Sequence, residues 1–125
     1  MFKHVTLAVM FGVAMLFANS ATAEDAPDIK GEKVTLKGEV IDMWCYMEGG
    51  DHGADHKKCG TACIKAGNPV GLLDDKGGVY ILLGGKKDHQ PGHELLIDKV
   101  AETVTVEGTL VKKGDSRVVF VTSVK

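Results

Sequence analysis

The sequence predicts a mainly β fold, a small five-stranded Greek-key barrel with a short Cys/His-bearing helix inserted after the first strand. Alternating apolar and polar residues, which indicate half-buried strands, occur in the segments 33–41, 103–111 and 118–124. A turn signal joins two further strands at 70–73 and 79–83, and a short helical turn is expected within 94–102. This order fits an OB-type barrel, which places a helix between its third and fourth strands. A five- or six-stranded barrel of another topology is the main alternative.

The apolar positions of the long strands repeat every second residue, so each strand has one face suited to a core. On the first strand these positions are Val34, Leu36, Gly38 and Val40. On the fourth they are Val104, Val106, Gly108 and Leu110, and on the fifth Val118, Phe120, Thr122 and Val124 share one side. The acidic and glycine-rich segment 74–78 supplies the hairpin turn between the second and third strands.

Composition sets limits on the class of protein. Of the 125 residues, 44% are hydrophobic and 26% are charged, which is typical of one soluble globular domain and excludes a mostly disordered chain. The formal net charge of -2 argues against nucleic acid as a partner, because nucleic-acid binding usually requires a basic excess.

The N-terminal segment has the pattern of a secretory signal peptide. Residues 1–23 combine a short basic start, an apolar run and an Ala21-Thr22-Ala23 cleavage pattern. We therefore expect a periplasmic or secreted protein with no stable membrane anchor after cleavage. Residues 24–32 are expected to form a flexible lead-in, and 33–125 a single barrel domain.

The chemically informative residues are three cysteines and two histidines. The segment 51–66 is predicted to be a helix, and on it His52, His56, Cys59 and Cys63 would share one face about 60° wide. Cys45 would approach this row from the end of the first strand. These five residues form the predicted metal site, because Zn²⁺ and copper both accept sets of thiolate and imidazole ligands.

A structural disulfide competes with this hypothesis, since cysteines of exported proteins are usually bridged. A bridge between Cys59 and Cys63 fits poorly, because side chains four apart on a helix are farther apart than a disulfide allows. The bridge would instead join Cys45 to one of them and leave an odd thiol. The chain would then be a non-catalytic binding or interaction module without metal.

The metal hypothesis can be made more specific. Copper is preferred to zinc because Met43 and Met47 flank Cys45 and Cu(I) favours thiolate and thioether ligands. Haem ranks below both ions, since the covalent C-x-x-C-H motif does not occur. No substrate pocket or oxyanion hole is recognisable, so we expect no enzyme. The expected role is a carrier, buffer or sensor, whose partners are the metal ion and an exported protein that donates or accepts it.

The cysteine-containing segments resemble a pattern found in small exported bacterial proteins, most of them uncharacterised. The resemblance rests on Trp44-Cys45-Tyr46-Met47, His56, Cys59, Cys63-Ile64 and the segment 67–73, with 104–109 similar to strand four of OB-fold-like exported domains. It implies a compact β domain with a Cys/His insertion and no settled activity. A fainter similarity, limited to Cys59 and Cys63, links the ligand chemistry to copper chaperones of cytochrome oxidase assembly.

Overall fold

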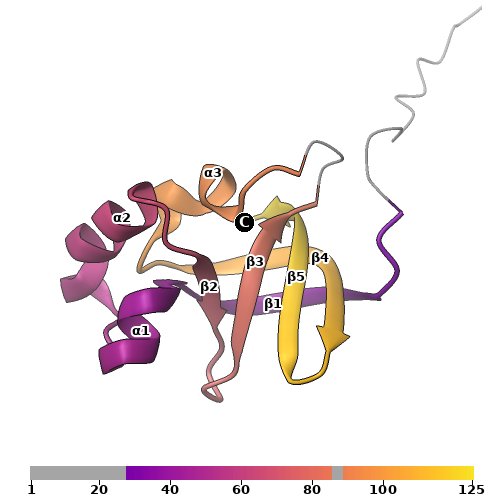
Figure 1. Ribbon diagram of the computed structural model, residues 1–125, viewed down its shortest axis with the longest axis horizontal. Coiled ribbons are helices and arrows are strands. Elements are labelled where there is room, and N and C mark those ends of the chain that lie inside the picture. The colour runs from indigo at the N-terminus through magenta and orange to yellow at the C-terminus, as the bar shows by residue number, and fades with distance from the viewer. Residues whose placement is uncertain (1–27, 86–88) are drawn as a thin grey trace, which may run out of the picture.

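A computed structural model describes residues 28–85 and 89–125 of the chain (Figure 1). The predicted signal peptide and residues 24–27 of the predicted lead-in lie outside the described residues. The elements in chain order are β1 (Glu32–Asp42), α1 (Met43–Gly49), the 3-10 turn η1 (Ala54–His56), α2 (Lys57–Lys65), β2 (Val70–Leu73), β3 (Val79–Gly84), α3 (Gly92–Leu96), the 3-10 turn η2 (Ile97–Lys99), β4 (Thr103–Lys113) and β5 (Ser116–Val124).

The five strands close into a barrel in the order β1-β2-β3-β5-β4, with β4 pairing back to β1. The β3–β5 pair is parallel, and the other four pairs are antiparallel. The helical segment α3–η2 lies between β3 and β4. This arrangement confirms the predicted mainly β, OB-like barrel, because both the strand order and the position of this helix fit that type.

The core fills the barrel with aliphatic side chains from every strand and from the connecting helices. Its buried members are Val40, Ile64, Val70, Leu72, Leu82, Leu96, Val100, Val104, Val106, Leu110, Val119 and Val121. The predicted inward faces of β1 and β4 are confirmed. On β5 the buried residues are Val119 and Val121, opposite to the set that the alternation places together with Phe120.

Two sequence-based boundaries are wrong. Cys45, which the sequence places at the end of the first strand, lies instead in the separate helix α1, residues 43–49. The predicted helix over 51–66 begins only at Lys57, after an irregular stretch and the turn η1. Gly53 explains the delay, because its φ of 85° lies in the left-handed region and interrupts a regular helix.

The segment 43–69 leaves and re-enters the barrel at one place. Asp42 at the end of β1 pairs with Val70 at the start of β2, and the Met43 amide donates to the Pro69 carbonyl over 3.0 Å. The helices α1 and α2 therefore lie together beside one end of the barrel (Figure 1).

The side chain of Ile64 fixes α2 to this scaffold, because it is fully buried in the barrel core. An exposed ion pair adds a second link, with Lys57 Nζ 2.8 Å from Glu102 Oε2. This lysine lowers the pKa of the Glu102 carboxyl through a hydrogen bond and its charge. Among the described residues, no helix has the length and apolar character needed to cross a membrane.

Candidate metal centre

The helix α1 positions Cys45 at the mouth of the barrel. Asp42 caps its first turn, since Asp42 Oδ2 accepts a hydrogen bond from the Cys45 amide at 3.1 Å. Gly50 ends the helix in the left-handed conformation, and its amide donates to Tyr46 O at 2.8 Å. Between these two stops, Cys45 is the buried residue of the helix, with 7% of its surface exposed.

The helix α2 supplies the other two thiols. Cys59 and Cys63 are four residues apart and therefore share one face of the helix. Cys59 is exposed and Cys63 is partly buried. Gly60 lies between them on the buried side, where a Cβ atom would come within 3.1 Å of Val100 and 3.2 Å of the His56 ring. A glycine in this helix thus allows the His56 ring and Val100 to approach its backbone closely.

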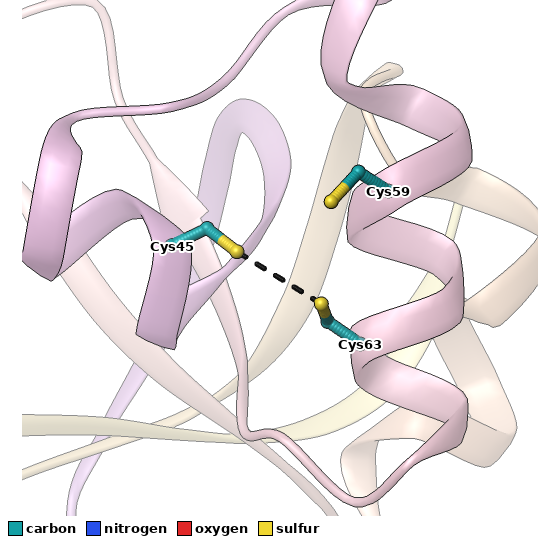
Figure 2. Close-up of side chains that lie close together, drawn as sticks. All are labelled: Cys45, Cys59 and Cys63. Carbon is teal, nitrogen blue, oxygen red and sulfur yellow. Dashed lines mark hydrogen bonds between the residues drawn. The ribbon is translucent and has the colours of Figure 1, made fainter.

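The three sulfur atoms converge in the space between α1 and α2 (Figure 2). They all lie within 4.8 Å of one another, and Cys45 Sγ is 3.9 Å from Cys63 Sγ. Two thiolates bound to one tetrahedral zinc ion, each at about 2.3 Å, are about 3.8 Å apart. The sulfur spacing therefore suits ligands of a single ion, and these three residues could hold a metal.

Comparisons with family models, curated proteins and solved structures found no match for this chain.

A second group of potential ligands shares Cys45 with the first. Ligand atoms of Asp42, Cys45 and His56 also lie within 4.8 Å of one another. Asp42 is completely buried, and its Oδ1 atom has no hydrogen-bond partner. The Nε2 atom of His56 is likewise buried and without a partner. Cys45 consequently connects a group of three sulfurs with a group that adds a carboxylate and an imidazole.

The structure brings together four of the five residues predicted for the site. Cys45, Cys59 and Cys63 form the first group, and His56 joins Cys45 in the second. His52 belongs to neither group. It lies in the irregular stretch before η1, where its Nδ1 atom is 3.0 Å from Glu39 Oε2. The predicted row of four donors on one helix is therefore wrong for both histidines, because α2 starts at Lys57 and His56 ends η1.

The structural disulfide is not supported. All three cysteines are free thiols in the structure. The nearest pair of sulfurs, Cys45 and Cys63, is separated by 3.9 Å, whereas a disulfide bond requires about 2.0 Å.

The environment of Cys45 favours its protonated form when no ion is bound. Hydrogen bonding to Asp42 is the largest cause, followed by burial and the neighbouring Cys63, and together they raise the pKa of Cys45 to about 12. The negative charge of a Cys63 thiolate would also raise the pKa of Cys59. Because a metal binds the thiolate, an ion that occupies the site must displace these protons.

Alkylation should proceed in a defined order in the metal-free protein. Because its raised pKa keeps Cys45 protonated at pH 8, iodoacetamide should modify Cys45 last. The exposed Cys59 should react earlier. Mass spectrometry of peptides from a time course measures the order. In denaturant the three rates should become similar, and rapid modification of Cys45 in the folded protein would contradict the described environment.

The methionines beside Cys45 have different surroundings. Met43 packs over β2, where its sulfur occupies the space that a side chain on Gly71 would need. Met47 and Trp44 are both exposed on α1, at 64% and 61% of their surface. Met43 thus serves as a packing residue on the barrel, and thioether ligation by it has no support from the structure.

Sequence reasoning missed Asp42 as a member of the site. The signal was an aspartate directly before a short apolar segment that ends in Gly49-Gly50, which is the pattern of a capped helix. Placing Cys45 at the end of the first strand concealed this cap.

Proposed function

We propose that this chain is an exported metal-binding protein that acts as a carrier, buffer or sensor and carries out no catalysis. The observation that supports the proposal most strongly is the convergence of Cys45, Cys59 and Cys63, whose sulfurs already have the spacing of ligands on one ion. Copper, as Cu(I), is the first candidate because it favours sets of thiolate ligands, and Zn²⁺ is the second. The export of the chain rests on its N-terminal sequence pattern.

The exposure of the site suits reversible loading. Cys45 is buried and Cys59 is exposed to solvent, so an incoming ion would bind first to the exposed Cys59 thiol. The same opening would allow a thiol of a partner protein to contact the ion and remove it by ligand exchange. This access favours a carrier or buffer over a structural site, in which all ligands are usually enclosed.

Elemental analysis tests the proposal directly. Protein purified from the periplasm under reducing conditions should contain at least one equivalent of copper or zinc, and chelation should expose three titratable thiols. A variant with serine at positions 45, 59 and 63 serves as the control and should contain neither metal. If the reduced wild-type protein binds neither Cu(I) nor Zn²⁺ when titrated, the proposed function is wrong.

A further inference from the structure

The second ligand group has an unusual feature that the three-sulfur site does not explain. Among the described residues, three buried side-chain polar atoms have no hydrogen-bond partner, and two of them belong to this one group. They are Asp42 Oδ1 and His56 Nε2. Buried polar atoms in folded proteins are nearly always paired. Two unpaired atoms in side chains that belong to one spatial group therefore indicate a missing partner that both can bind.

The Asp42 carboxylate is also without a compensating charge. It is completely buried, and no cationic side chain in the described part of the chain forms an ion pair with it. Buried charges are ordinarily paired with an opposite charge or bound to a metal. A carboxylate oxygen, a thiolate and an imidazole nitrogen are all ligands of zinc-like divalent ions.

The two groups share Cys45, and this determines how a second ion would be held. We infer that the site binds two metal ions, one on Cys45, Cys59 and Cys63, and a second, divalent ion on Asp42, Cys45 and His56, with the Cys45 sulfur bridging both. This inference rests on the proposed function, since it adds a second position to the same centre.

Charge balance supports two ions over one. Three thiolates already outnumber the positive charges of a single Zn²⁺ or Cu⁺ ion, so one ion in the sulfur position leaves the buried Asp42 carboxylate uncompensated. Zn²⁺ in both positions brings four positive charges, which equal the negative charges of three thiolates and one carboxylate. Cu⁺ in the sulfur position with a divalent ion in the other leaves an excess of one negative charge. Burying a neutral cluster costs far less desolvation free energy than burying a charged one.

The glycine at position 60 is consistent with this arrangement. A side chain there would come within 3.5 Å of His56 Nε2, the atom that lacks a partner. Glycine costs a helix stability, and its presence keeps the region around this nitrogen open.

Counting bound ions tests the inference. Zn²⁺ is titrated into reduced, metal-free protein at constant pH, and native mass spectrometry counts the ions on each molecule. The wild-type protein should take up two. Asp42→Asn and His56→Gln should each take up one ion, held by the three sulfurs. The affinity for this ion should fall by no more than about 100-fold, as for loss of a neighbouring group that is not a ligand. Cys59→Ser should also retain one, held by the second group.

The matched control is His52→Gln. It removes the histidine four positions before His56, which belongs to neither group. It should retain two ions. Thermal unfolding of each metal-free variant checks folding, and Asp42→Asn keeps an oxygen that can cap α1. If Asp42→Asn does not fold, His56→Gln and Cys59→Ser still decide the result.

The outcomes separate this inference from the proposed function. A wild-type protein that binds one Zn²⁺, whether or not His56→Gln weakens it, overturns the second position and leaves the metal-binding function intact. A protein that binds neither Zn²⁺ nor Cu(I) overturns both.

Discussion

Cys45→Ser should remove metal binding more completely than any other single substitution. Cys45 is the one residue common to both ligand groups, so its loss leaves two sulfurs on one side and only a carboxylate and an imidazole on the other. We expect the affinity for the first ion to fall by more than about 100-fold, beyond the effect of losing a group that only supports a ligand. A competitive titration with a chromogenic chelator measures this change.

The comparison with Cys59→Ser makes the test specific. Both substitutions replace a thiol by a hydroxyl of similar shape, but Cys59 is exposed and belongs to one group only. Cys59→Ser should therefore retain an ion when Cys45→Ser retains none. Because serine can occupy the place of Cys45 on α1, the metal-free variant should keep its circular dichroism spectrum. Equal affinities of Cys45→Ser and wild type would rule out Cys45 as a ligand.

Ile64→Ala should produce the largest loss of stability among substitutions near the site. Ile64 is fully buried in the barrel core although it belongs to α2, between the site and the barrel. Truncating a buried isoleucine to alanine typically costs about 2–5 kcal/mol, a large part of the about 5–15 kcal/mol that stabilises a domain. Urea denaturation of the metal-free protein measures the change in free energy of unfolding.

Lys65→Ala is the matched control, because Lys65 is the next residue of α2 and is exposed. It should change the free energy of unfolding by less than about 0.5 kcal/mol. A similar loss for both variants would show that the anchoring of α2 does not depend on the burial of Ile64. Adding metal should recover part of the stability lost in Ile64→Ala, since a ligand that binds only the folded state favours it.

The barrel was predictable because its information is local. The alternation in β1 and β4 marks the buried faces, and the segment 74–78 marks the hairpin. The inward face of β5 was harder to assign. Its residues alternate between two apolar sets, and the register that starts at the Lys113–Ser116 pair places Val119 opposite Leu110. The register shift between Glu107 and Gly108 then changes the pairing at the end of β5.

The site was only partly predictable, because its geometry depends on contacts between distant segments. The spacing of Cys59 and Cys63 on a helix was visible in the sequence. The role of Asp42 was not, because a strand residue becomes a ligand candidate only when η1 places His56 near it. The spacing of His52 fits the same helix face as the cysteines. Its pairing with Glu39 and the positive φ of Gly53 instead place it outside both ligand groups.

The closure of the barrel also has a consequence for how the chain acquires its structure. The first strand is completed by the fourth, and Glu32 pairs with Leu110, so this contact joins residues far apart in sequence. Chains dominated by such distant pairings fold slowly, on a scale of milliseconds to seconds. During synthesis the three thiols emerge well before β4 and β5, so they lie on an unfolded polypeptide until these strands have been made. Their capacity to capture an ion should therefore appear late and abruptly, together with the cooperative formation of the scaffold.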